Sequence, residues 1–161
     1  FSADSDAVTP VSLTNHAYFN LAAGQHSILD HHLRLDADYY LPLDETGIPC
    51  GELTLTANSR FDFRKPRPFS QDLPNGKVDT DGYDQGYLLN SRETPVDSRR
   101  PVASLWDGNK TLRMDIATDL PAMQVYTGNH LHTEPAGVNR NFAQHAGVAL
   151  ETAFLPDSPN L

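Results

Sequence analysis

The sequence predicts an all-β fold, a sandwich of antiparallel strands, and two observations support that prediction. Twelve prolines and ten glycines interrupt the 161 residues, and no stretch keeps a 3.6-residue apolar period long enough for a long helix. Short extended segments bounded by turn residues recur instead, which is typical of β-sandwiches. We find no internal repeat and no linker, so residues 1–161 are expected to form a single domain.

Most of the expected strands alternate apolar with polar residues. Residues 111–118 are the clearest, because Leu112, Met114 and Ile116 share one face of an extended chain, as in an antiparallel strand with one solvated side. In chain order, the expected strands are residues 8–13, 32–39, 51–56, 86–90, 102–106, 111–118, 123–127 and 147–152. Turn signals separate them at residues 44–47, 74–76 and 107–109, and the polar residues 90–100 are expected to form a long surface hairpin loop.

Composition excludes several classes of function. The formal net charge is −9 and Lys and Arg do not cluster, which argues against nucleic-acid binding. No apolar run approaches the roughly 18 residues of a membrane span, and residues 1–4 do not resemble a signal peptide. The lone Cys50 excludes an internal disulfide and a cysteine-based zinc site, and it fits the cytoplasmic location that we expect. The absent initial Met and the abrupt end at residues 159–161 suggest a fragment of a longer chain.

Most of the seven histidines need no special role. Surface positions in a polar segment are expected for His26, His31 and His32. Residues 130–134 (HLHTE) resemble a metal site, but the flanking glycine and proline favour a loop, so no metal is expected there. Residues 79–84 resemble a calcium-binding loop only weakly, because the later acidic ligands are missing.

Two groups could transfer protons. His16 lies among two asparagines and two aromatic residues in residues 15–20 (NHAYFN), and imidazole exchanges protons near neutral pH. A hydrogen-bonded structural histidine explains the same pattern. Glu151 interrupts an apolar strand, and partial burial would raise its pKa toward the range useful for a base. A glutamate on an edge strand, pointing into water, explains that pattern equally well.

Five segments, in this order, resemble the signatures of the aldose 1-epimerase (galactose mutarotase) family. They are residues 14–21 (TNHAYFNL), 38–49 (DYYLPLDETGIP), 82–84 (GYD), 124–129 (QVYTGN) and 149–160 (ALETAFLPDSPN). The resemblance covers about residues 8–160 and indicates the carboxy-terminal half of such an enzyme. It implies a large twisted antiparallel β-sandwich, the galactose mutarotase-like supersandwich, of which this chain would be a part.

The resemblance also implies roles for individual residues. His16 matches the general acid that protonates the sugar ring oxygen, and Glu151 matches the general base that deprotonates the anomeric hydroxyl. The two side chains would flank one open cleft, about one sugar ring apart. The residues expected to bind the sugar are Asp84, Gln124 and Asn15. Gln85 departs from the family, whose members usually carry a histidine at this place.

The predicted function is therefore that of a mutarotase interconverting the α and β anomers of free hexoses such as galactose or glucose. Mutarotation delivers one proton and removes another without a redox step, so no metal or organic cofactor is expected. The expected partners are the sugar and a missing amino-terminal half that completes the sandwich, with no nucleic acid and no membrane. The alternatives are a non-catalytic or sugar-phosphate-recognising relative on the same fold, or an inactive fragment. Retention of both His16 and Glu151 favours the enzyme.

Overall fold

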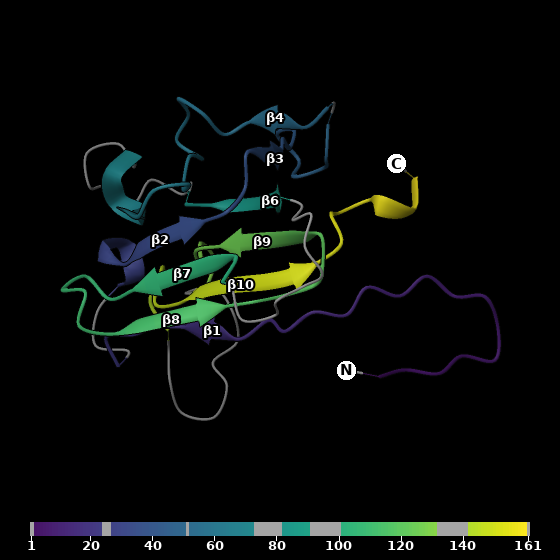
Figure 1. Cartoon of the computed structure of the whole chain (residues 1–161), viewed down its shortest axis with the longest axis horizontal. Coiled ribbons are helices and arrows are strands. Elements are labelled where there is room, and N and C mark those ends of the chain that lie inside the picture. The colour runs from purple at the N-terminus through teal and green to yellow at the C-terminus, as the bar shows by residue number, and fades with distance from the viewer. Residues whose placement is uncertain are drawn as a thin grey trace.

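The computed structural model describes residues 2–23, 27–50, 52–72, 82–90, 101–131 and 142–160, and within these ranges the protein is an antiparallel β-sandwich. The larger sheet has the order β1 (Tyr18–Phe19), β10 (Val148–Ala153), β9 (Ala122–Tyr126), β6 (Asp84–Leu88), β3 (Tyr39–Leu41) and β4 (Thr54–Leu55). The smaller sheet has the order β5 (Arg67–Pro68), β2 (His32–Leu35), β7 (Ala103–Trp106) and β8 (Arg113–Ile116). The two sheets overlap in the view of Figure 1.

Helical structure in the described residues is limited to short 3₁₀ turns. They are η1 (Ile28–Asp30), η2 (Phe69–Asp72) and η4 (Ser158–Asn160). None of the helices described is long and apolar enough to cross a membrane. The expected all-β sandwich without long helices is confirmed over these ranges.

One hydrophobic core joins the two sheets. Tyr87 and Met123 reach it from the six-stranded sheet, and Leu33 and Leu105 reach it from the four-stranded sheet; all four are fully buried. Burying a side chain of this size stabilises the fold by about 1.5–3 kcal/mol. Because alternate residues of a strand face opposite sides, the core fixes which residues of the larger sheet point away from it.

Residues 32–39 do not form one strand, contrary to expectation. The chain pairs first in the smaller sheet, as β2, and then crosses to the larger sheet, as β3. The residue types alternate as far as Tyr39, but burial follows them only to Ala37: Leu33, Leu35 and Ala37 are buried, whereas Tyr39 is 41% exposed. The pattern that predicted a strand is therefore present, but it contains no signal for the change of sheet.

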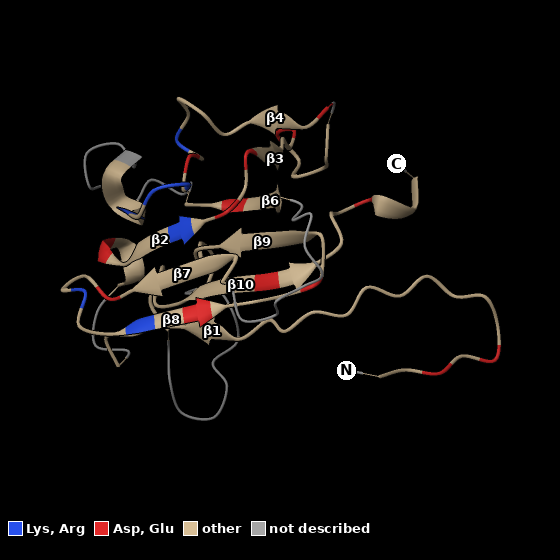
Figure 2. Cartoon of the chain, in the orientation of Figure 1, with Lys and Arg blue, Asp and Glu red and all other residues tan. Residues whose placement is uncertain are grey.

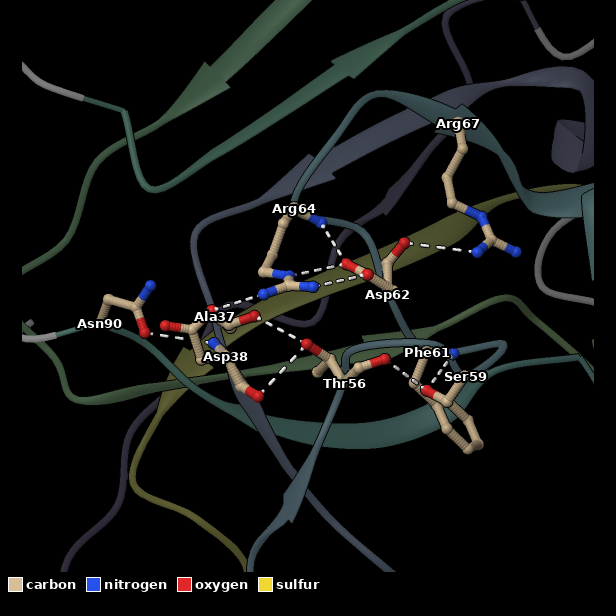
Figure 3. A network of polar contacts seen from close by, with 9 residues as sticks. All are labelled: Ala37, Asp38, Thr56, Ser59, Phe61, Asp62, Arg64, Arg67 and Asn90. Atoms are coloured by element: carbon tan, nitrogen blue, oxygen red, sulfur yellow. Dashed lines mark hydrogen bonds and ion pairs between the residues drawn. The ribbon is translucent and has the colours of Figure 1, made fainter.

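A polar network holds this crossing in place (Figure 3). Arg64 lies 3.2 Å from the Asp38 carboxylate and 2.8 Å from that of Asp62. The Thr56 hydroxyl lies 3.2 Å from the Asp38 carbonyl, and the Asn90 side-chain oxygen accepts a hydrogen bond of 3.1 Å from the Asp38 amide. Backbone groups that lose their strand partners at the crossing therefore find side-chain partners.

Two further expectations about the chain path are wrong. Residues 8–13 are not a strand; they belong to an exposed segment that leaves the sandwich in Figure 1. Their alternation predicts a face that packs on a surface, but Val8, Val11 and Leu13 are exposed in this structure. Residues 90–100 do not join a hairpin, because β6 and β7 belong to different sheets. Residues 91–100 themselves lie outside the described ranges.

The other expected strands are present, with shifted ends. Residues 51–56, 86–90, 102–106, 111–118, 123–127 and 147–152 contain or overlap β4 and β6 to β10. Strands β1 and β5, each two residues long, were not predicted. The turns at residues 44–47 and 107–109 are present, with Asp44 and Asp107 accepting backbone hydrogen bonds. The turn expected at residues 74–76 lies outside the described residues.

Candidate active site

The register of the larger sheet places three strands side by side beneath the candidate site. Glu151 of β10 pairs with Gln124 of β9, which in turn pairs with Gly86 of β6. The neighbours Leu150 and Val125 belong to the core, so this row lies on the sheet face that points away from it. Strand β10 lies between β1 and β9, and Glu151 lies two residues beyond Ala149, where the pairing with β1 ends. The Glu151 side chain is 13% exposed, so it does not point into water as the edge-strand interpretation required.

Asp84 occupies the next row of the same face. It pairs with Tyr126 of β9, which pairs with Ala149 of β10. Figure 2 shows acidic residues on both β6 and β10, the strands that carry Asp84 and Glu151. Two carboxylates thus share the sheet face on which the amide of Gln124 also lies.

His16 reaches this face from the segment that precedes β1. Its Nε2 atom lies 3.4 Å from Oε1 of Glu151, with side chains 50% and 13% exposed, respectively. The amide of Ala17 donates a hydrogen bond of 2.9 Å to the Asn15 side-chain oxygen, which forms a local turn around His16. The imidazole of His16 is therefore half exposed and in contact with a carboxylate.

The separation of these two side chains is shorter than the sugar ring expected from the sequence. Both reacting oxygens of a hexose, the ring oxygen and the anomeric oxygen, are bonded to the same carbon. An acid and a base that serve this carbon therefore lie close to each other rather than on opposite sides of the ring. Direct contact of His16 with Glu151 is compatible with such a pair before a sugar is bound.

The environment of Glu151 favours its protonated form. Burial raises the pKa of Glu151 above its usual value, the nearby imidazole of His16 opposes this rise, and the Asp84 carboxylate adds to it. A carboxylate with a raised pKa is a stronger base.

Asp84 fixes the orientation of the Gln124 amide. The two side chains are 2.7 Å apart, and a carboxylate can only accept, so the Gln124 nitrogen must be the donor. The Gln124 Oε1 atom is consequently turned away from Asp84, and it is buried without a hydrogen-bond partner among the described residues. The Gln124 oxygen therefore has hydrogen-bonding capacity that no described residue uses.

Two tyrosines, not predicted from the sequence, complete the surroundings of His16. The ring centroids of Tyr18 and Tyr126 lie 4.9 and 6.4 Å from that of His16. The Tyr126 hydroxyl accepts a hydrogen bond of 3.0 Å from the His130 amide, which holds its ring in place. Both tyrosines stand in the motifs identified in the sequence, but only the register aligns them beside His16.

A pocket of about 560 Å³ opens beside the pair, a size typical of small-molecule sites. Its lining includes Glu151, Gln124 and Gly86, together with residues 10–12 and 154–159. His16 and Asp84 are not among the lining residues, so the pocket extends from the Glu151 side of the pair. Gly86 allows Leu155 and Gln124 to pack closely against β6 in the pocket wall. A Cβ atom at this position would lie 3.1 Å from Leu155 and 3.2 Å from the Gln124 oxygen.

The two remaining positions singled out in the sequence are Asn15 and Gln85. Asn15 is exposed next to His16, with its oxygen bonded to the backbone. Gln85 lies between Asp84 and Gly86 on β6, and strand alternation turns it to the opposite face of the sheet. The replacement of a histidine by Gln85 therefore does not alter the face that carries Glu151.

The surface position expected for His31 is wrong. Its side chain is fully buried; Nε2 accepts a hydrogen bond of 3.0 Å from the Leu21 amide, and Nδ1 lies 2.9 Å from the Asp30 carboxylate. The buried imidazole thus anchors the chain just after β1. His26, like His132 and Glu134 of the metal-like motif, lies outside the described residues. No cluster of three metal-ligating side chains occurs within the described ranges.

Comparisons with known proteins agree with these motifs. The sequence profile of one family, described as aldose 1-epimerase, matches residues 1–161. The chain is 39% identical over 164 residues to the aldose 1-epimerase of Escherichia coli, and 36% identical over 163 residues to the galactose mutarotase of Homo sapiens. Each alignment covers 99% of this chain and 46% of the relative, so the chain spans about half the length of these proteins.

Solved structures show the same similarity. A galactose 1-epimerase from Lactobacillus acidophilus superposes with a TM-score of 0.69 at 30% identity, covering 90% of this chain and 40% of that one. A GalM/aldose epimerase homologue from C. elegans superposes with a TM-score of 0.76 at 20% identity, covering 94% of this chain and 44% of that one, and it supports the fold alone.

Proposed function

This chain belongs to the aldose 1-epimerase family, and on that premise we propose that its protein interconverts the α and β anomers of free hexoses such as galactose or glucose. The observation that carries the proposal is the contact of 3.4 Å between His16 Nε2 and Glu151 Oε1. An imidazole and a carboxylate that touch each other at the edge of an open pocket can deliver one proton and remove another.

In the proposed reaction, Glu151 removes the proton from the anomeric hydroxyl while His16 protonates the ring oxygen. The bond between C1 and the ring oxygen breaks, and the anomeric oxygen becomes the carbonyl oxygen of the open-chain aldehyde. Rotation about the bond between C1 and C2 then presents the other face of the carbonyl carbon. Ring closure reverses the two proton transfers and returns each group to its starting state, so no metal or organic cofactor is consumed or required.

Asp84, Gln124 and Asn15 are the proposed sugar-binding residues. Asp84 supplies a carboxylate acceptor, and Gln124 supplies the buried Oε1 that has no partner within the described structure. Sugar hydroxyls are donors, so acceptors held on one rigid sheet face would fix the ring against His16 and Glu151. Asn15 adjoins His16 and would contact the sugar through its amide nitrogen, because its oxygen is bonded to Ala17.

We further propose that an amino-terminal half completes the sandwich. The exposed apolar side chains of Val8, Val11 and Leu13 support this, because an alternating segment normally packs against a partner. A cytoplasmic location is proposed as well, since a single cysteine suits a reducing compartment.

Polarimetry of freshly dissolved α-D-galactose tests the proposed activity on the full-length protein. His16→Ala and Glu151→Ala should each slow mutarotation by about 10²–10⁴-fold, the usual contribution of a general acid or base. Glu45→Gln, in an exposed turn, is the matched control and should leave the rate unchanged. Wild-type rates in both site variants would refute the assignment. Galactose binding without any acceleration would instead indicate a non-catalytic relative.

A further inference from the structure

A group of buried polar side chains lies behind Asp84 and takes no part in the proposed proton transfers. Thr127, Asn129 and His145 are 0%, 6% and 1% exposed, respectively, and we call them the Thr127 cluster. Thr127 and Asn129 follow β9, and His145 precedes β10. Burying polar groups costs free energy unless each is hydrogen-bonded, so their partners show what the cluster holds.

The cluster binds both backbone groups of Tyr83, the residue immediately before Asp84. The Tyr83 amide donates 2.8 Å to the Thr127 hydroxyl, and the Tyr83 carbonyl accepts from the Thr127 amide at 3.0 Å. The Asn129 side-chain nitrogen also donates to that carbonyl, at 3.3 Å. The Thr127 hydroxyl has one proton, and its shortest acceptor is the Asn129 oxygen at 2.7 Å. These bonds form a closed ring of donors and acceptors around the backbone of one residue, Tyr83.

Neighbouring groups make the ring rigid. His145 Nδ1 lies 2.7 Å from the Thr127 carbonyl, and the His145 amide donates 3.1 Å to the Gly128 carbonyl. Gly82 packs directly on the cluster, because a Cβ atom there would lie 2.1 Å from both Asn129 Oδ1 and Thr127 Oγ1. The backbone that leads into β6 therefore has one position available to it.

We propose that Asn129 and Thr127 are positioning residues that set the place of the Asp84 carboxylate, and through it the Gln124 amide, against the sugar. The inference rests on the proposed function. Asp84 is exposed, so the location of its carboxylate depends on the backbone that carries it. That carboxylate orients Gln124 through the contact of 2.7 Å described above. Loss of the hydrogen bonds around the Tyr83 backbone would displace the Asp84 carboxylate and the Gln124 oxygen. The positions of His16 and Glu151 would not change.

A double-mutant cycle on the full-length protein tests this inference. Asn129→Ala should raise the KM for galactose roughly tenfold and leave kcat within about twofold, because it removes buried hydrogen bonds that serve binding. In an Asp84→Ala background, the same substitution should raise KM no further, since no carboxylate is left to misplace. Ser104→Ala is the control, because Ser104 is equally buried and hydrogen-bonded, at 2.6 Å to Asp115, in the other sheet.

A second pair of variants covers the case in which Asn129→Ala does not fold. Thr127→Ser keeps the hydroxyl and should retain the wild-type KM, whereas Thr127→Val removes it and should raise KM. Effects of Asn129→Ala that add fully to those of Asp84→Ala would overturn the inference, as would a fall in kcat at unchanged KM. The same cycle measured as galactose dissociation constants by calorimetry separates this outcome from failure of the proposed function. A wild-type protein that binds galactose without turnover refutes the activity but still reports the coupling, and one that neither binds nor turns over refutes both.

Discussion

Gly82→Ala should lower the free energy of unfolding by more than backbone strain at this position could, because the added methyl group has no room. The added Cβ atom would lie 2.1 Å from Asn129 Oδ1, 2.1 Å from Thr127 Oγ1 and 2.8 Å from His145 Cε1. All three neighbours are buried and hydrogen-bonded, so none can move without breaking a bond. Overpacking costs about 1–3 kcal/mol, and each polar group left unsatisfied adds about 1–3 kcal/mol. With one polar group left unsatisfied, we therefore expect the free energy of unfolding to fall by roughly 2–6 kcal/mol.

Gly47→Ala is the matched control for this substitution. Gly47 has a φ of +80°, where an alanine is strained, but no atom lies within 4 Å of the Cβ position. It should cost only about 1–2 kcal/mol. Urea denaturation followed by fluorescence of the single tryptophan, Trp106, measures both variants. Equal losses for Gly82→Ala and Gly47→Ala would show that the Thr127 cluster yields to the methyl group, and the packing argument would fail.

Three further substitutions test individual contacts. Glu151→Gln should slow the catalysed mutarotation by about 10²–10⁴-fold, as Glu151→Ala should. It should also raise the melting temperature at neutral pH, because the folded protein raises the pKa of Glu151 and ionisation of this group therefore costs stability. That gain should vanish as the pH falls below the usual value of 4.5. Asp62→Asn should lower the free energy of unfolding by about 1 kcal/mol at neutral pH, because hydrogen bonds from Arg64 lower the pKa of Asp62 in the folded protein. Thermal unfolding should show that the difference between variant and wild type disappears in acid, below the usual pKa of 3.8. His31→Leu should lower the free energy of unfolding in urea by roughly 1–3 kcal/mol, because the half-buried Leu21 amide would lose its acceptor. A His31→Leu protein as stable as the wild type would contradict the anchoring role.

The Thr127 cluster, the proposed sugar-binding residues Asp84 and Gln124, and the proposed proton-transfer residue Glu151 all belong to the larger sheet or to the loops at its strand ends. Strands β9 and β10 carry Gln124 and Glu151, and the loops at their ends carry Asn129 and His145. In the proposed arrangement, contacts made at the strand ends would set the positions of side chains on the sheet. Substitutions that never touch a sugar can change its affinity by this route.

The sequence by itself determined the class of fold and the proton-transfer candidates. Alternation with period two is a local property, so residues 111–118 and 147–152 could be assigned to strands from their own composition. Five ordered motifs then connected His16, Glu151, Asp84 and Gln124 with one family. Exposure could not be assigned in this way, because His31 lies in a polar segment and is nevertheless fully buried.

Only the tertiary structure decided which strands are neighbours and what the site residues contact. Alternation specifies the two faces of a strand but not its partner, and for this reason the change of sheet between β2 and β3 leaves no trace in the sequence. The contact of His16 with Glu151 and the ring around Tyr83 join segments that are far apart in the chain. Such contacts depend on the register between β6, β9 and β10, which is set by the packing of the shared core and not by any one segment.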